Sequence, residues 1–137
     1  MKRQRAAALL EFALAWPVAL LIVMSTVEAA VWAAEGYAAR AASVAGARAG
    51  SVAGGTAEVA RAVALRTLGA SLVGEVPRPW CPGDGPPVPA VWVCADDLGE
   101  AIDVDVGGTV PALVPLVLGA GLPIHAHVVV PKEGFAR

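Results

Sequence analysis

The feature that most constrains this chain is an uncharged apolar run near its N-terminus. The 16 residues from Phe12 to Val27 carry no charge, and the run reaches 22 residues from Ala6 if Glu11 is tolerated within it. A helix rises about 1.5 Å per residue, so about 20 apolar residues cross the roughly 30 Å hydrocarbon core of a bilayer. We therefore expect a transmembrane helix over residues 7–28.

Positive charge is concentrated on one side of this run. Lys2, Arg3 and Arg5 precede it, and the next cation along the chain is Arg40. Basic residues beside a transmembrane helix are retained on the cytoplasmic side of the membrane. We expect a single-pass protein of the cytoplasmic (inner) membrane, with its N-terminus in the cytoplasm and its remaining chain outside.

A cleavable secretory signal peptide is the main alternative, because it also joins basic residues to an apolar run. Two features favour a retained helix. Glu11 lies inside the run, where a carboxylate costs on the order of 3 kcal/mol at the membrane centre and less near an end. The run also continues into an alanine-rich stretch, in which Val27-Glu28-Ala29 is only a weak cleavage site.

A carboxylate at Glu11 needs a partner in the membrane. If the chain is cut between Ala6 and Ala7, Glu11 becomes the fifth residue and lies one helical turn from the new α-amino group. In an assembly, the amine of one subunit could pair with the carboxylate of its neighbour, which would offset the desolvation of both groups.

The segment from Arg5 to Leu14, followed by Pro17 and a Leu/Ile/Val stretch, resembles the class III (type IV pilin-like) signal of the TadE-like proteins. These are minor pilins or pseudopilins of the tight-adherence pilus. The resemblance implies cleavage between Ala6 and Ala7 by a prepilin peptidase. The residue before the cut is usually Gly in this family, and here it is Ala6.

The resemblance also implies a function and partners. The expected product is a non-enzymatic subunit for pilus assembly, adhesion or secretion, with a hydrophobic helix and a small β-rich head. Its partners would be the prepilin peptidase, the major pilin and other minor pilins, the pilus assembly platform and membrane lipid, and its final place could be a cell-surface pilus. Glu11 would be read by both the peptidase and the assembly. The alternative is a bitopic, membrane-anchored binding domain that is neither processed nor assembled.

Proline separates a helical half of the chain from the rest. Of eleven prolines, only Pro17 precedes Pro77, and the stretch between them is rich in helix-forming residues. We expect Pro17 to kink the membrane helix without ending it. The helix should leave the membrane and run to about Ala53, within an extracytoplasmic helical region over residues 29–76.

Small residues recur every four positions near the end of this helix, at Ala42, Gly46, Gly50 and Gly54. Such stripes let two backbones approach closely. They are equally compatible with packing against neighbouring subunits and with packing under the chain's own head. Gly54-Gly55 should end the helix, and Thr56 should cap a second one from about Ala57 to Ala70.

The remaining segment, 77–137, should form the head, which begins with an ordered proline-rich loop from Pro77 to Pro87. Three strands are expected, at Ala90–Cys94, Ala101–Val106 and His125–Val130, with turns at Asp96-Asp97 and Gly107-Gly108. Val110–Gly119 is either a short helix or an extended crossover. The fold class is α+β, with a small antiparallel sheet packed on helix.

Cys81 and Cys94 flank the proline-rich loop and are the two cysteines of the chain. A pair of cysteines in an exported domain usually forms a disulfide. Closing a loop of about 14 residues would stabilise the head by roughly 3 kcal/mol. A metal or redox pair is the alternative, but the C-x-x-C spacing is missing.

Other groups that could bind a metal give no complete site. His125 and His127 should project from one face of a strand, but a zinc site needs a third or fourth ligand, and a secreted zinc enzyme is therefore a minor hypothesis. Acidic residues gather earlier in the head, at Asp96, Asp97, Glu100, Asp103 and Asp105. They do not match a calcium loop, and their alternation with Ile102, Val104 and Val106 predicts a solvated strand face.

The sequence also argues against two broad classes of function. The chain has ten Lys and Arg residues against twelve Asp and Glu residues, so no basic excess is available to bind nucleic acid. It contains no recognisable nucleophile motif or phosphate-binding loop. We therefore expect neither an enzyme nor a metal or other cofactor.

Overall fold

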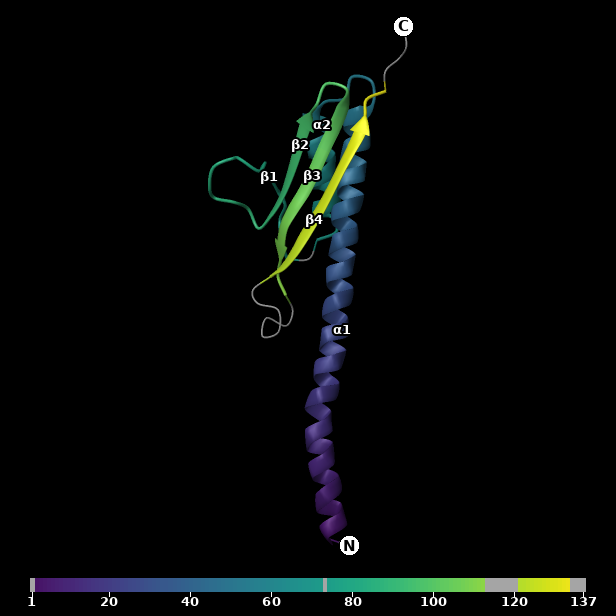
Figure 1. Ribbon diagram of the computed structural model, residues 1–137, viewed down its shortest axis with the longest axis vertical. Coiled ribbons are helices and arrows are strands. Elements are labelled where there is room, and N and C mark those ends of the chain that lie inside the picture. Colours follow the sequence, from purple (N-terminus) through teal and green to yellow (C-terminus); the bar gives the residue numbers. More distant parts are fainter. Residues whose placement is uncertain (1, 73, 113–120, 134–137) are drawn as a thin grey trace.

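The computed structural model describes residues 2–72, 74–112 and 121–133, with side chains from Glu11 onward. Six elements follow one another along the chain: α1 (Lys2–Ser51), α2 (Ala57–Gly69), β1 (Arg78–Pro79), β2 (Val91–Asp97), β3 (Ala101–Val110) and β4 (Leu122–Pro131). The helix α1 projects from the head as a long stalk with the N-terminus at its free end (Figure 1). The expected α+β class, with a long N-terminal helix, is confirmed.

The stalk and part of the head are one continuous helix of 50 residues. It passes through Pro17 without ending and stops two residues before the expected end at Ala53. Thr26 lies in the apolar part of the helix, where its hydroxyl donates to the carbonyl oxygen of Val23 at 2.7 Å. This bond satisfies the one hydrogen that the Thr26 side chain can donate, so the hydroxyl is compatible with a lipid environment.

The link between the helices follows the expected chemistry. Gly54 adopts a positive φ of 79° in the turn after α1, a conformation that glycine adopts without strain. Thr56 then caps α2, because its hydroxyl accepts a hydrogen bond from the Val59 amide at 3.3 Å. Glu58 lies in the first turn of α2, where its negative charge interacts favourably with the helix dipole.

The sheet has the order β1-β2-β3-β4. The pairs β2–β3 and β3–β4 are antiparallel, as expected, but β1 pairs with β2 in parallel. The sheet is therefore mixed rather than wholly antiparallel. The reason is the loop over residues 80–90, which stands out from the sheet edge and returns the chain so that β2 runs in the same direction as β1 (Figure 1).

The strands extend beyond their expected ends. Asp96 and Asp97 belong to β2, opposite Asp103 and Ile102, and the turn follows at residues 98–100. The expected turn at Gly107-Gly108 is also wrong, because both glycines pair with β2 and β4 inside β3. Of the ambiguous segment Val110–Gly119, residues 113–119 lie outside the described ranges.

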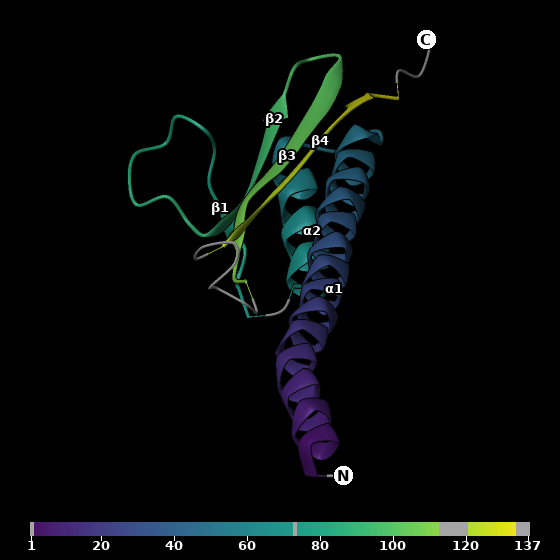
Figure 2. The same ribbon diagram turned by 60° about the horizontal axis from the view of Figure 1, so that its bottom comes forward.

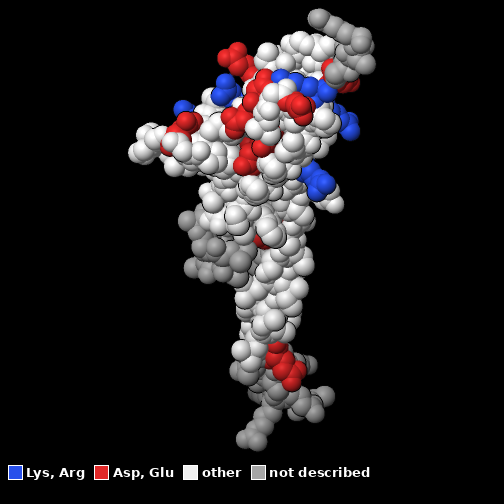
Figure 3. Space-filling model, turned by 45° about the horizontal axis from the view of Figure 1, so that its top comes forward, with Lys and Arg blue, Asp and Glu red and all other residues white. Residues whose placement is uncertain are grey.

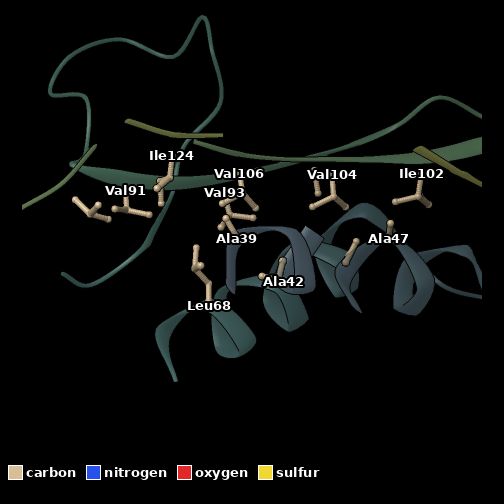
Figure 4. Close-up of a cluster of buried hydrophobic side chains, with 14 residues drawn as sticks. Ala39, Ala42, Ala47, Leu68, Val91, Val93, Ile102, Val104, Val106 and Ile124 are labelled. Carbon is tan, nitrogen blue, oxygen red and sulfur yellow. The ribbon is translucent and has the colours of Figure 1, made fainter. Parts of the chain in front are cut away.

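Both helices cover the same face of the sheet, and the opposite face is left to solvent (Figure 2). The core between the layers is built from small residues on the helices and β-branched residues on the strands (Figure 4). Ala39, Ala42 and Ala47 of α1 are completely buried, and their short side chains let the helix lie close to the sheet. Burial of each valine or isoleucine on the strands contributes about 1.5–3 kcal/mol.

Candidate functional site: the membrane helix and its junction with the head

The free part of α1 presents an almost wholly apolar surface. Within the described residues, α1 is the one helix long and apolar enough to cross a membrane, with a mean hydropathy of 1.9 over its most apolar 18-residue window. Large apolar side chains are exposed around the helix, at Phe12, Leu14, Trp16, Val18, Leu20, Leu21, Ile22, Val23, Met24 and Val27. A surface of this kind is unfavourable in water and favourable in lipid. The structure is therefore compatible with single-pass membrane anchoring.

Glu11 lies at the N-terminal end of this apolar surface. Its side chain is exposed, and the next residue, Phe12, stacks against Trp16 with 6.1 Å between the ring centroids. Ala6 and Ala7 lie in the same helix, about one turn earlier. The carboxylate of Glu11 is thus on the surface of the helix.

The junction of the stalk with the head contains residues whose roles the sequence analysis did not identify. Glu28 and Glu35 are seven positions apart on one side of α1, are only 4% and 5% exposed, and both have interaction partners. Near them, the indole nitrogen of Trp32 donates to the carbonyl oxygen of Pro123 at 2.9 Å. This bond ties α1 to the start of β4, so the head is attached from about this level of the helix.

The small-residue stripe is used inside the chain. A β-carbon at Gly46 would lie 2.7 Å from the carbonyl oxygen of Ala60 and 2.8 Å from the β-carbon of Ala64, and one at Gly50 would lie 2.8 Å from the β-carbon of Ala60. Ala42 is buried in the same core. Gly46 and Gly50 thus pack against α2 of their own head, the second of the two possibilities.

Gly54 does not belong to this packed stripe. It lies beyond the end of α1 in the turn, and a β-carbon there would have nothing within 4 Å. The four-residue spacing continues past the helix, but the helical geometry that would align Gly54 with Gly50 does not.

The expected disulfide joins Cys81 and Cys94, with 4.7 Å between their α-carbons. Two further contacts fix the start of the loop that it closes. The Trp80 amide donates to the Val93 carbonyl oxygen, and the ring of Trp80 packs edge-on against Trp92 at 5.4 Å. The disulfide and the aromatic pair therefore hold the loop over residues 80–90 against the edge of the sheet.

The solvent-facing side of the sheet joins the histidines to the acidic cluster. The Nε2 atom of His125 lies 3.0 Å from Oδ1 of Asp105, and Nε2 of His127 lies 2.8 Å from Oδ1 of Asp103. Neither contact has the direction of a good hydrogen bond, and both Oδ1 atoms are buried without a hydrogen-bond partner. We therefore regard these as close electrostatic contacts across β3 and β4 and not as strong bonds.

The acidic turn has one well-formed ion pair. Lys132 donates to both carboxylate oxygens of Asp97, at 2.6 and 2.7 Å, and the Gly99 amide donates to Oδ1 at 2.8 Å. The hydrogen bond from Lys132, followed by that from Gly99, lowers the pKa of Asp97 from its ordinary value of 3.8. The turn after β2 is thus stabilised by the ionised form of this side chain.

Metal binding has little geometric basis in the described part of the chain. The one group of three side chains whose ligand atoms converge there is Cys81, Cys94 and Asp96. The two sulfur atoms of that group are joined in the disulfide, so they are not available as thiolate ligands. His125 and His127 each approach one carboxylate, but they do not form a converging set of three with the acidic residues.

Comparison with known proteins identifies no relative, because no protein family, curated protein or solved structure matches this chain.

Proposed function

We propose that this protein is a membrane-anchored subunit of a tight-adherence, type IV-like pilus, with the role of a TadE-like minor pilin or pseudopilin. Its helix would be held in the cytoplasmic membrane with the leader inside and the head outside. A prepilin peptidase would remove residues 1–6, and the helix would then join the major pilin and other minor pilins at the assembly platform. The protein would contribute by assembly and contact, without catalysis.

The observation that carries this proposal is the exposure of Glu11 at the start of the apolar helix. A single carboxylate at that place is a liability for a simple anchor but useful for pairing with a neighbour's amine. The division of α1 supports the same role. Its N-terminal half is bare and suited to lipid or to other helices, whereas its C-terminal half is fixed in the head.

A bitopic binding domain that stays unprocessed is the second candidate, and one observation favours it. The space over Gly46 and Gly50, where another subunit could have packed, is already occupied by α2. A protein built in this way needs no neighbour to complete its fold. Whether residues 1–6 are removed distinguishes the two candidate functions, because only the pilin role requires their removal.

The test is the N-terminal residue of the mature protein, measured by intact mass and terminal sequencing after expression with a prepilin peptidase. We expect the chain to begin at Ala7. The Ala6→Gly variant, which restores the residue usual in the family, should be cut at least as completely. A chain that keeps Met1 in the presence of an active peptidase, or one cut near residue 29, would contradict the proposal.

The role of Glu11 is tested separately, with Leu14 as a matched control on the same exposed stretch of helix. Glu11→Ala should still insert into the membrane but should fail to co-purify with pilus subunits. Leu14→Ala also removes an exposed side chain, but it leaves the carboxylate and should co-purify normally. Equal recovery of the two variants with pilus subunits would count against the pairing role.

A further inference from the structure

The two outer faces of the head differ in charge. On the helix side, a shallow groove of about 510 Å³ runs along α1 and is lined by Tyr37, Arg40, Ala41, Val44, Ala45 and Arg48. Both arginines are exposed. We call this surface the arginine groove; it lies on the side of α1 opposite to the residues that the helix buries in the head.

The opposite face of the head is acidic. Asp103 and Asp105 project from the solvent side of β3, since the intervening Val104 is buried in the core. Asp96 lies opposite Asp103 on β2. We call these three residues the acidic face, and acidic side chains are seen to gather over the head in Figure 3.

Two histidines lie against the acidic face: Nε2 of His125 is 3.0 Å from Oδ1 of Asp105, and Nε2 of His127 is 2.8 Å from Oδ1 of Asp103. The lysine and arginine nearest to the face have other positions. Lys132 is bonded to Asp97, and Arg78 is on β1 at the sheet edge, paired with Trp92. Each head therefore has a positive surface on the outer side of α1 and a negative surface on the solvent side of the sheet.

The two surfaces lie at the same height along the helix axis. In the core, Ala39 is beside Val93 and Val106, and Ala47 is near Ile102 (Figure 4). Arg40 and Arg48 are the next residues of α1 after these alanines, so Arg40 is near the level of Asp105 and Arg48 near that of Asp103. Two copies anchored in one bilayer at equal depth would thus bring these surfaces together without any shift along the helix.

We propose that the arginine groove of one copy docks against the acidic face of a second copy of this chain. The contact is heterologous, because each copy binds one neighbour through its arginine groove and a second neighbour through its acidic face. Contacts of this kind form rows or filaments. Ala41 and Ala45 contribute only short side chains to the lining of the groove. Electrostatic attraction supplies the orientation and partner choice.

This inference deepens the proposed assembly role and rests on it for its biological setting. Its physical basis is independent of leader removal and of other pilus components. The experiment can therefore use the full chain alone in zwitterionic lipid vesicles, where the arginines have no anionic headgroup to bind. Energy transfer between donor-labelled and acceptor-labelled copies reports self-association.

The decisive variants each reverse the sign of the charge on one of the two surfaces. Arg40→Glu with Arg48→Glu makes the groove acidic, and Asp103→Lys with Asp105→Lys makes the sheet face basic. Alone, each variant should lose association roughly tenfold, because like charges then face each other. Mixed together they should associate again, because the altered surface of each matches a surface of the other.

Two controls complete the design. Arg66→Glu reverses an exposed cation on α2 outside the groove and should leave the signal unchanged. The wild-type signal should fall when salt is raised from about 0.01 M to about 1 M, which shortens the Debye length from ~30 Å to ~3 Å. Should a reversal variant fail to fold by circular dichroism, Arg40→Gln with Arg48→Gln and Asp103→Asn with Asp105→Asn replace the pair, and each must weaken association.

Three results would overturn the proposal. Folded reversal or neutralised variants could keep the wild-type signal, or the mixture of folded reversal variants could stay at background. The sheet variant alone could also associate as the wild type does, which would indicate a symmetric contact between two helix grooves. None of these results bears on the N-terminal residue of the mature chain, so this proposal and the pilin proposal fail independently.

Discussion

The indole ring of Trp92 covers the α-carbon of Gly107 on the neighbouring strand, and a β-carbon at Gly107 would overlap Cζ2 of Trp92 and lie 2.9 Å from its Cε2. Trp92 and Gly107 are direct partners in the register of β2 and β3. Gly107 therefore leaves room for the indole ring to pack over the strand, and it does not form a turn.

We predict that Gly107→Ala destabilises the head by about 1–3 kcal/mol, the usual cost of overpacking a close contact. Chemical denaturation of the full chain in detergent, followed by tryptophan fluorescence, measures the change. Gly85→Ala is the control, since a β-carbon there meets nothing within 4 Å. An unchanged midpoint for Gly107→Ala would mean that the ring can move aside without cost.

This pair also explains why local sequence rules misplaced the end of β3. Two adjacent glycines favour a turn, and nothing in the neighbouring residues indicates that a tryptophan from another strand lies over the first of them. Gly108 has a second reason to be glycine: its φ is 139°, and a side chain would overlap the Ala90 carbonyl. Both reasons depend on β2, which is far away until the strands pair.

The features that were predicted correctly are those with a local cause. The end of α1 and the cap of α2 follow from Gly54 and Thr56, which act through their own backbone and nearest neighbours. The pairing of Cys81 with Cys94 was predictable because the chain has no other cysteine. The contacts of His125 and His127 with aspartates depend on the register of β3 and β4, which alternation alone leaves undetermined.

A second prediction concerns the contact between the two helices. Gly46→Ala places a methyl group 2.7 Å from the Ala60 carbonyl oxygen, so α1 and α2 must separate. We expect a loss of about 1–3 kcal/mol in the free energy of unfolding. Gly36→Ala, where a β-carbon has nothing within 4 Å, should instead stabilise the helix by about 0.5–1 kcal/mol. Equal effects of the two substitutions would contradict the packing described for Gly46.

A third prediction tests the tie between stalk and head. Trp32→Phe keeps an aromatic ring but removes the donor to Pro123, and it should cost about 0.5–1.5 kcal/mol. Hydrogen exchange at the start of β4 should become faster. Trp16→Phe is the matched control, since Trp16 lies on the bare part of α1 and its ring stacks on Phe12. If both variants leave exchange in β4 unchanged, the Trp32 bond does not hold the strand.

A fourth prediction concerns the disulfide. Replacing Cys81 and Cys94 together by alanine should lower the stability of the head by roughly 3 kcal/mol, because the unfolded chain is then no longer closed into a loop. Reduction of the wild-type protein should give a similar loss. A stability that is the same with and without the bond would contradict this prediction.

The last prediction is a pH dependence at Asp97. The hydrogen bonds from Lys132 and Gly99 lower the pKa of this carboxyl group in the folded protein, so its ionised form favours folding. The stabilisation is therefore fully present above the unfolded pKa of 3.8 and is lost as the pH falls through the lower, folded pKa. We expect wild type to be more stable than Asp97→Asn at pH 7, with the difference shrinking through the acidic range below about pH 5. Denaturation of both proteins across this range measures the difference, and a gap that stays constant down to the lowest pH would show that Asp97 acts without its charge.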